Sequence, residues 1–379
     1  MRGAAAALLL AGLVPLLGRR PAGPPPSGGG PEEGRGWTAR PDEAADRAVE
    51  RALRWLAGPE SYVPRDGSFL LGDAENPAPV AVTALAALAA LAHGECEGRG
   101  KYGSIVAGAV AYLLRHQVHA PGRVDDGYFQ ADNDKLSRTH GHGYATLCLA
   151  EALGQTGFSR DSPIPGEKAI RAALVRAVRF IERIQGPSGG WYYYPYRDPE
   201  SHEGSVTITL VQALRAARNA GIKVDIRVIR KADNYVHRLQ RRDGSFRYML
   251  GSERPSTMGL TAAAIATLNM TGIYDDPAIA RGLAWLKSQE RFRQARRRFM
   301  GEAGFPFPFY ERLYLAQAYW QSRSLAHWKT WFAREKAYIL KLQRTNGSWA
   351  SKKYGAVYAT AVNCLVLQMP YNYLPIFQR

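Results

Sequence analysis

The chain has 379 residues, 46% of them hydrophobic, and carries a formal net charge of +17 at pH 7. Its three cysteines exclude a disulfide framework, and its length alone would allow two domains. The basic charge indicates either an ordinary solvated surface or an anionic partner such as phospholipid headgroups or acidic glycan. A nucleic-acid partner is not expected, because no nucleic-acid-binding module is recognisable.

The N-terminal part of the chain is predicted to lie outside the folded domain. Residues 1–18 combine a basic start with an apolar stretch of signal-peptide length, which indicates a signal peptide or an uncleaved N-terminal anchor. Residues 19–43 are rich in Gly and Pro and predict a disordered linker. We therefore expect an exported protein, periplasmic or held at the cell envelope, whose folded part spans residues 44–379.

Two kinds of helical segment alternate through this folded part. In residues 170–184 apolar side chains recur at i, i+3, i+4 and i+7 while arginines occupy the other side, which predicts an amphipathic helix. Residues 48–56, 229–239, 279–286 and 331–342 behave in the same way. Each of these helices should bury one face and expose the other.

The second kind of helix is apolar all round. Residues 79–92, 258–270 and 356–369 contain no charged residue, and residues 143–153 contain only Glu151. Helices of this composition are buried on all sides, and segments this short cannot cross a bilayer.

A turn made of glycine and an aromatic residue joins each amphipathic segment to the apolar segment that follows. Its period of roughly 55–60 residues is typical of a repeat architecture. Six copies of an outer helix, a turn and an inner helix predict an all-α fold, an α/α toroid of six helical hairpins in two concentric rings. The turn glycines are Gly67, Gly127, Gly189, Gly244, Gly347 and, in a degenerate copy, Gly304.

Three of these turns also begin with glutamine: QGPSGGW at 185–191, QRRDGSF at 240–246 and QRTNGSW at 343–349. The pattern resembles the repeat of squalene–hopene cyclases and protein prenyltransferase β-subunits, and the resemblance covers residues 44–379. HGHGYAT at 140–146 and YNYLP at 371–375 are similar to exported bacterial proteins with prenyltransferase/squalene-cyclase repeats. The resemblance implies a terpenoid cyclase/prenyltransferase toroid.

In the resembling enzymes the N-termini of the inner helices surround a deep apolar cavity that holds an isoprenoid. The resemblance therefore implies a central cavity with apolar walls, tyrosines among them, and a few polar groups at its mouth. The residues that it places at this cavity are His140, His142, Tyr144, Tyr192, Tyr194, His202, Glu203, Arg254, Glu311, Tyr314, Tyr354 and Tyr358.

A cyclase of this kind uses an Asp-x-Asp-Asp cluster to protonate an alkene, and that cluster is not intact here. Residues 132–135 read Asp-Asn-Asp-Lys, and a lysine beside the acid lowers the pKa of the carboxyl, the wrong direction for a proton donor. The other acidic pair precedes Gly127 and also suits a turn. The acids expected nearest to any chemistry are Asp125, Asp126, Asp132 and Asp134.

No cofactor or metal is expected. A zinc-dependent prenyltransferase would need an Asp-x-Cys turn, which the sequence lacks. His140 and His142 are two residues apart, and on a helix such residues face different sides.

The sequence thus predicts a squalene-cyclase/prenyltransferase-like protein that binds an isoprenoid or another apolar lipid, with terpene cyclisation as its enzymatic version. Two other functions stay open: a non-catalytic toroid scaffold or binding protein, favoured by the broken acid motif, and a polysaccharide lyase or glycosidase of α/α-barrel type. A peripheral contact with an anionic membrane surface is a further expectation, and the densest basic run on the predicted surface is Arg291, Arg293, Arg296, Arg297 and Arg298.

Overall fold

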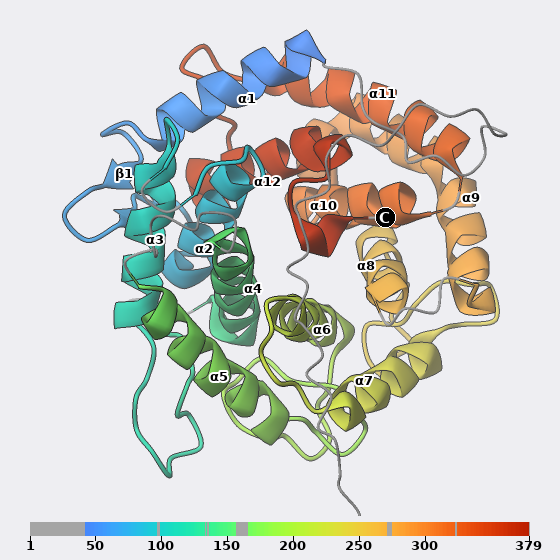
Figure 1. The fold of residues 1–379 in the computed structure, drawn as a ribbon. Coiled ribbons are helices and arrows are strands. Elements are labelled where there is room, and N and C mark those ends of the chain that lie inside the picture. The colour runs from blue at the N-terminus through green and yellow to red at the C-terminus, as the bar shows by residue number, and fades with distance from the viewer. Residues whose placement is uncertain are drawn as a thin grey trace, which may run out of the picture. The chain divides into compact units, whose positions relative to one another are not determined.

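The computed structural model describes residues 42–96, 99–132, 134, 136–156, 166–270, 275–322 and 324–378. The predicted signal peptide at 1–18, almost all of the linker at 19–43, and Lys135 lie outside these residues. Within them, helices of an outer and an inner ring alternate along the chain, as the sequence predicts (Figure 1). None of the helices in these described stretches is both long enough and apolar enough to span a membrane.

The outer ring consists of α1 (Glu43–Leu56), α3 (Gly103–Arg115), α5 (Glu167–Arg183), α7 (Ile226–Leu239), α9 (Pro277–Met300) and α11 (Leu325–Leu342). The inner ring consists of α2 (Pro79–Leu91), α4 (Arg138–Thr156), α6 (Gly204–Asn219), α8 (Met258–Met270), α10 (Pro308–Gln321) and α12 (Gly355–Gln368). Both rings close, because α12 packs on α2 and α11 on α1. A short antiparallel pair, β1 (Tyr62–Val63) and β2 (Ser68–Phe69), forms the first turn.

The glutamine of each typical turn joins its hairpin to the next one. The Nε2 of Gln185 donates to the carbonyl of Gly189 in its own turn, at 2.9 Å, and to the carbonyl of Val228 on α7, also at 2.9 Å. Gln117, Gln240 and Gln343 repeat this double bond to their own turn and to the next outer helix. For Gln343 the next helix is α1, where it reaches Ala48, so the last hairpin is joined to the first.

The turn glycines pack directly on the neighbouring outer helix. Gly189 has a φ of +99°, a backbone conformation that L side chains rarely adopt, and a Cβ added there would lie 2.2 Å from the carbonyl oxygen of Lys231. Gly347 meets the carbonyl of Arg51 on α1 in the same way. Glycine is therefore required both for the turn and for the close approach of the helices.

The degenerate fifth turn is held by buried charges instead. Glu335 on α11 is 1% exposed and accepts hydrogen bonds from Arg293 and Arg297 of α9 and from Arg312 of α10. Arg312 also binds Glu302 in η1 (Gly301–Gly304), and Arg293 binds Glu311. We call these six residues the ion network. Arg293 and Arg297 thus do not belong to a solvated or lipid-facing surface, which corrects the sequence expectation for the basic run.

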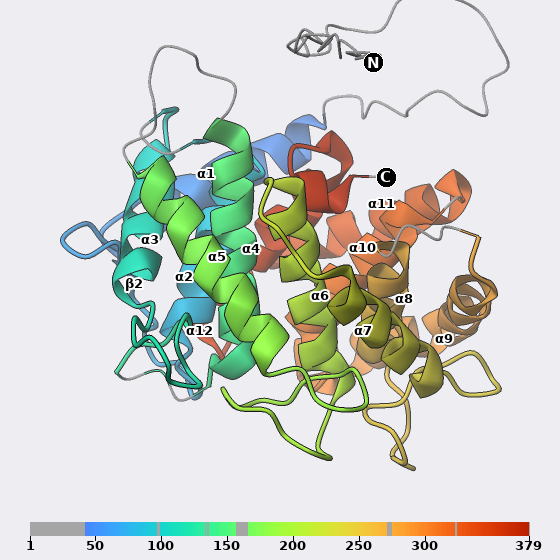
Figure 2. The same cartoon turned by 60° about the horizontal axis from the view of Figure 1, so that its bottom comes forward.

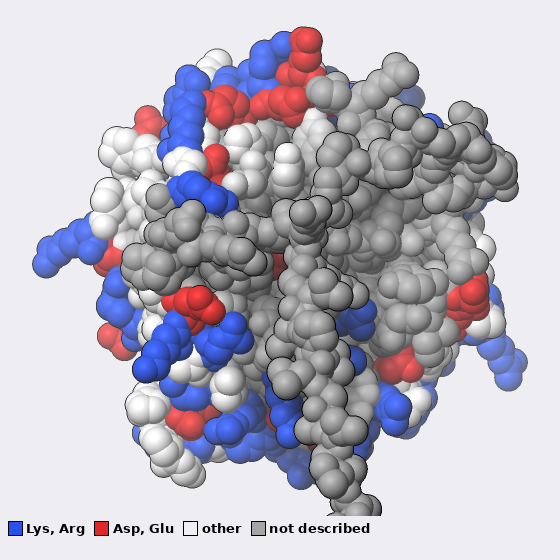
Figure 3. All heavy atoms as spheres, in the orientation of Figure 1, with Lys and Arg blue, Asp and Glu red and all other residues white. Residues whose placement is uncertain are grey.

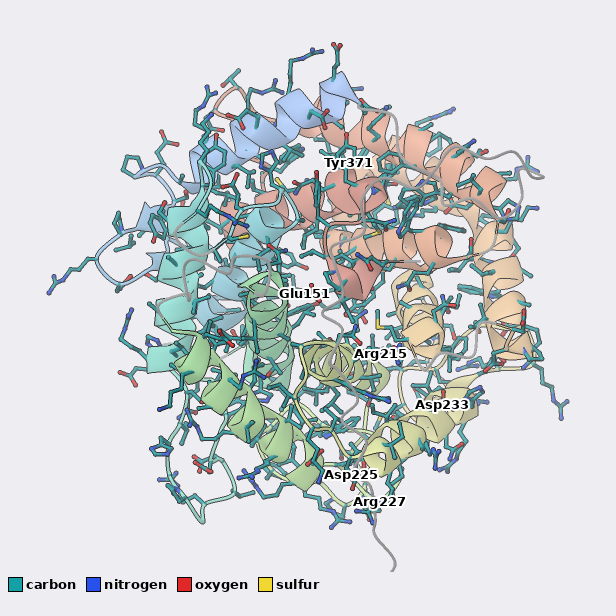
Figure 4. The ribbon with its side chains drawn as sticks, in the orientation of Figure 1. Glu151, Arg215, Asp225, Arg227, Asp233 and Tyr371 are labelled. Atoms are coloured by element: carbon teal, nitrogen blue, oxygen red, sulfur yellow. The ribbon has the colours of Figure 1, made fainter. Side chains whose placement is uncertain are left out.

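The C-terminal segment of the chain packs over the C-terminal ends of the inner helices. It contains η2 (Met369–Tyr371) and η3 (Pro375–Phe377), and η3 contacts α6. Glu151 points from α4 toward the centre of the ring, and its Oε1 accepts the N–H of Ile376 at 3.2 Å (Figure 4). Burial raises the pKa of Glu151 to about 8, so this carboxyl is mostly protonated at neutral pH.

Candidate functional site

The inner helices are exposed mainly at their ends. Five of them each expose part of a residue in their first turns, whereas the following turns of these helices are almost completely buried. The long loops that precede α4, α6 and α8 gather at this end of the ring (Figure 2). We call this accessible end the mouth and define it by His140, Ser205, Leu260, Tyr310 and Tyr358.

A buried carboxyl is part of a hydrogen-bonded network at the mouth. Glu203 caps the N-terminus of α6, where its Oε2 accepts the N–H of Ser205 at 2.8 Å. The hydroxyl of Ser205 donates to the same carboxyl at 2.7 Å and meets the Nε2 of His140 at 3.1 Å. Tyr193 also hydrogen-bonds Glu203, and its hydroxyl contacts that of Tyr248. The network thus joins three elements: α4, α6 and the loops around Tyr193 and Tyr248.

Burial shifts the pKa values of Glu203 and His140 in this network in opposite directions. It raises the pKa of Glu203 to about 7, although the hydrogen bonds from Ser205 and Tyr193 oppose the rise. It lowers the pKa of His140 to about 4, and the charge of Arg138 acts in the same direction. At neutral pH His140 is therefore uncharged, and Glu203 retains its proton to a substantial extent.

Tyrosines from three helices form a wall beside this network. The rings of Tyr310 and Tyr314 on α10 are 4.6 Å apart, and those of Tyr354 and Tyr358 at the start of α12 are 5.2 Å apart. Tyr144 of α4 hydrogen-bonds Tyr314. Such rings offer apolar area, polar hydroxyl tips and faces that attract cations.

Beyond this wall, buried polar side chains of α6 and α10 bond to one another. The Nε2 of Gln212 on α6 donates to the Oε1 of Gln317 on α10 at 2.7 Å, and the hydroxyls of Thr209 and Tyr314 are 3.4 Å apart. Because α6 and α10 are not neighbours in the ring, these bonds cross its centre. Thr209 and Gln212 lie roughly 6–10 Å beyond Ser205 at the usual helical rise. These bonds place polar groups in the interior of the inner ring, where the resemblance implies apolar walls.

His142 has a structural role and does not lie at the mouth. It is completely buried among Tyr128, Phe129 and Phe180, and its Nδ1 accepts the N–H of Phe129 at 3.3 Å. In three other hairpins a threonine hydroxyl accepts the matching N–H of the turn aromatic: Thr207 for Trp191, Thr261 for Phe246 and Thr360 for Trp349. His142 thus occupies a repeat position, facing the outer helix α5.

The other predicted mouth residues divide into near and distant ones. Tyr144, Tyr314, Tyr354 and Tyr358 belong to the tyrosine wall, and Glu203 is the centre of the network. His202 is 3% exposed and lies under the third turn, bonded to Ser188 and to the carbonyl of Asp198. Glu311 belongs to the ion network, and the exposed Arg254 offers its carbonyl to Arg241.

Tyr192 and Tyr194 lie in the loop before α6, outside the wall. Tyr192 contacts both Tyr193 and Tyr194, and Tyr194 stacks on Tyr196 with only 3° between the ring planes. Tyr194 and Tyr196 are 40% and 45% exposed. The guanidinium of Arg138 lies 5.1 Å from the Tyr194 ring centre. These rings form an external platform rather than part of the wall.

The structure gives three of the four predicted acids local structural partners. Asp125 forms a paired bond with Arg123, and Asp126 accepts the N–H of Ala120 within the turn. Asp134 accepts the N–H of Val80 and so caps the inner helix α2. Asp132 is exposed. The acid that the structure places in the network is Glu203, which sequence reasoning put among the ligand residues.

Sequence reasoning missed Ser205, Tyr248 and Tyr310, whose types and positions do not stand out until the network is visible. Among the residues that the structure describes, no group of three or more His, Cys, Asp or Glu side chains could hold a metal ion.

Part of the chain is similar to squalene–hopene cyclases. Residues 163–330 match the squalene–hopene cyclase C-terminal domain. A squalene–hopene cyclase from Bradyrhizobium diazoefficiens is 29% identical over 164 residues, which cover 40% of this chain but only 24%, about a quarter, of that relative.

Solved structures share the fold at low identity. The type II terpene cyclase MstE from Scytonema has a TM-score of 0.55 at 17% identity, covering 87% of this chain and 99% of its own. A variant of MstE is known in complex with its product, merosterolic acid A. A D-mannose isomerase reaches a TM-score of 0.56 at 12% identity, covering 86% of this chain and 96% of its own. These likenesses show the fold alone, and together with the family match over residues 163–330 they support a terpenoid cyclase/prenyltransferase-like toroid.

Proposed function

We propose that the protein binds an isoprenoid or related apolar lipid at the mouth, with an oxygen atom of the ligand next to the Glu203 network. The observation that carries this proposal is the placement of a protonatable carboxyl beside the tyrosine wall. The wall supplies apolar contact for a hydrocarbon chain, and the network supplies hydrogen bonds that fix one polar end. An apolar isoprenoid partitions into membranes, which agrees with the expected peripheral contact with an anionic membrane surface.

The pKa of about 7 limits the chemistry that Glu203 can perform. A carboxyl with a raised pKa keeps its proton at neutral pH, but it is a weak donor. It suits a hydrogen bond or proton transfer to an oxygen of the ligand better than protonation of an unactivated alkene. The residue is also completely buried, so a ligand would meet it through the partly exposed Ser205 or Tyr193. Binding is therefore the primary proposal, and terpene cyclisation is a secondary one.

Two measurements test this function. Mass spectrometry of organic extracts from the purified protein should detect a retained lipid. Purified protein stripped of lipid should bind geranylgeraniol, an isoprenoid alcohol, more tightly than squalene, a hydrocarbon. Tyr310→Ala and Tyr358→Ala should weaken both ligands, whereas Tyr196→Ala on the external platform should weaken neither. Equal binding of an acidic polysaccharide, or no binding of either isoprenoid, would contradict the proposal.

Glu203→Gln separates binding from turnover. The substitution keeps the shape of the side chain and removes its proton, so binding of hydrocarbon should stay nearly unchanged. Any cyclised product made by the unmodified protein should then disappear. Product that persists in Glu203→Gln but is lost in Asp125→Asn, Asp126→Asn, Asp132→Asn or Asp134→Asn would return the acid role to those residues.

A further inference from the structure

The third turn carries a hydrogen-bonded serine and histidine that the proposed function does not use. The Oγ of Ser188 lies 2.6 Å from the Nδ1 of His202. The Nε2 of the same ring lies 2.7 Å from the carbonyl oxygen of Asp198, which can only accept a hydrogen bond. In the neutral imidazole Nε2 therefore carries the proton, and Nδ1 is left to accept from the Ser188 hydroxyl. A serine that donates to an oriented imidazole has the arrangement of a base-activated nucleophile.

Asp198 contributes its side chain as well as its carbonyl. The carboxylate accepts the N–H groups of Glu200 and Ser201 and so fixes the loop that leads to His202. Burial opposes ionisation of this carboxyl, but these hydrogen bonds and the nearby charge of His202 lower its pKa. The carboxylate is therefore close enough to stabilise the imidazolium that forms when His202 takes up a proton.

The imidazole is held in place by close packing. His202 is 3% exposed, and the hydroxyl of Tyr235 donates to its carbonyl oxygen at 2.6 Å. A Cβ added at Gly186 would lie 1.7 Å from the Nε2 of His202, and one added at Gly190 would lie 2.9 Å from its Cβ. The two glycines on either side of Ser188 thus make room for the ring, which reduces its freedom to leave the serine.

The fold of the turn does not require this pair. In the fourth and sixth turns the position of Ser188 is taken by Asp243 and Asn346, whose side-chain oxygens accept the N–H of the residue two further on. The Ser188 oxygen is 3.5 Å from the matching nitrogen, that of Gly190, which is a long contact. The third turn therefore has a weaker bond within the turn and a short bond to a base.

We propose that Ser188 and His202 form a second site, outside the ring, that hydrolyses acyl esters. Ser188 is partly exposed in a surface turn while its base is buried, so an ester can reach the hydroxyl from solvent. The site is separate from the mouth, because the backbone of Glu203 is extended and successive side chains there point to opposite sides. His202 faces the turn, whereas Glu203 belongs to the network at the mouth.

The reaction proceeds in two steps that balance to ester plus water giving acid plus alcohol. The Ser188 oxygen bonds to the carbonyl carbon of the ester while its proton passes to the Nδ1 of His202. The bond to the alcohol oxygen then breaks, and His202 returns the proton to the leaving alcohol. Water attacks the acyl-serine in the same manner, which releases the acid and restores Ser188. The N–H of Gly190 is a backbone donor close to the negatively charged oxygen that forms in each step.

The probe should be a neutral ester. Lys and Arg side chains lie around the rim of the face shown in Figure 3, and the protein as a whole is strongly basic (Figure 3). An anionic ester would therefore bind at many places through charge alone.

The test combines covalent labelling with turnover. Purified protein is treated with a fluorophosphonate, which bonds to activated serines, and the modified peptide is identified by mass spectrometry. Hydrolysis of p-nitrophenyl butyrate is followed in parallel. The label should lie on Ser188, and hydrolysis should fall about 100-fold in Ser188→Ala and in His202→Gln. Ser68→Ala, at a partly exposed serine of the first turn, is the matched control and should change neither readout.

Ser188→Asp separates chemistry from folding. It introduces the residue type of the fourth turn, so it should keep the melting temperature while losing the label and the hydrolysis. Ester hydrolysis that persists in Ser188→Asp would overturn the proposal. So would the absence of label on Ser188 under conditions that modify a serine protease, or a label on Ser205 in its place. Isoprenoid binding at the mouth should be the same in Ser188→Asp as in the unmodified protein, so the two proposals can fail independently.

Discussion

Neighbouring hairpins of this ring are joined in two different ways. At four junctions a neutral glutamine amide binds its own turn and the next outer helix, and a turn glycine brings the two within backbone contact. At the fifth turn, three arginines and three glutamates perform this role in the protein interior. Each neutral junction loses little if one hydrogen bond fails. The ion network depends on complete charge compensation, because one missing carboxylate leaves several buried cations unpaired.

Removal of the central carboxylate should have the largest effect. Glu335→Ala leaves Arg293, Arg297 and Arg312 without their shared acceptor, and we expect a loss of about 3–5 kcal/mol in the free energy of unfolding. Urea denaturation measures this loss. Arg47→Ala, which breaks an exposed pair with Glu43, is the control and should cost less than about 1 kcal/mol. A loss at Glu335 no greater than that at Gln185→Ala would refute the distinction between the two kinds of junction.

The glycine of a neutral junction should be the next most sensitive position. Gly189→Val combines a strained φ with a clash against Lys231, and we expect a loss of about 2–4 kcal/mol. Gly122→Val is the matched control, because Gly122 has a φ of +89° but open space around it. Equal thermal destabilisation of the two variants would mean that the close approach of the helices contributes nothing.

A buried carboxyl bound only to the backbone should respond to pH in the opposite sense to the ion network. The folded-state pKa of Glu151, about 8, exceeds its usual value of 4.5. Between these values the folded state binds the proton and the unfolded state does not, so stability falls as pH rises from 4.5 to 8. Three nearby Arg charges instead hold the pKa of Glu335 well below its usual range.

Glu151→Gln should remove this dependence. Relative to the unmodified protein, the free energy of unfolding of this variant should rise by on the order of a few kcal/mol as the pH increases from 5 to 9, as measured by urea denaturation. Parallel pH profiles for the two proteins would show that Glu151 does not retain its proton in the folded state.

The loss of a single glutamine should be the smallest effect. Gln185→Ala leaves the carbonyls of Gly189 and Val228 without a donor, and we expect a cost of about 1–2 kcal/mol. Gln117→Ala and Gln240→Ala should cost similar amounts, because their bonds are equivalent. Markedly different costs in denaturant titrations of the three variants would show that the junctions are not interchangeable.

The repeat and its ring could be predicted because they depend on local signals. Helical periodicity, fully apolar segments and turn glycines each act within a few residues, and all appear in the structure as expected. The role of His142 could also have been recognised, since Thr207, Thr261 and Thr360 hold the corresponding position after the other turns.

The ion network and the site could not be derived in this way. Arg293 is buried because it pairs with Glu335, which lies 42 residues further along the chain. No local sequence pattern predicts that pairing. The same is true of the mouth, where His140 meets Ser205 across 65 residues. Gln212 and Gln317 gave one available signal of the polar bonds inside the ring, because both amides lie in the mostly apolar middle turns of inner helices.

The bond from Gln343 to Ala48 has a consequence for the order in which the chain can fold. It joins positions 295 residues apart, at the seam between the last and first hairpins. During synthesis one side of the first hairpin therefore stays exposed to solvent until the sixth hairpin has been made. Such long-range closure is slow and exposes unpaired apolar surface in the meantime. The nascent ring should depend on chaperones most strongly just before the sixth hairpin, α11 and α12, leaves the ribosome.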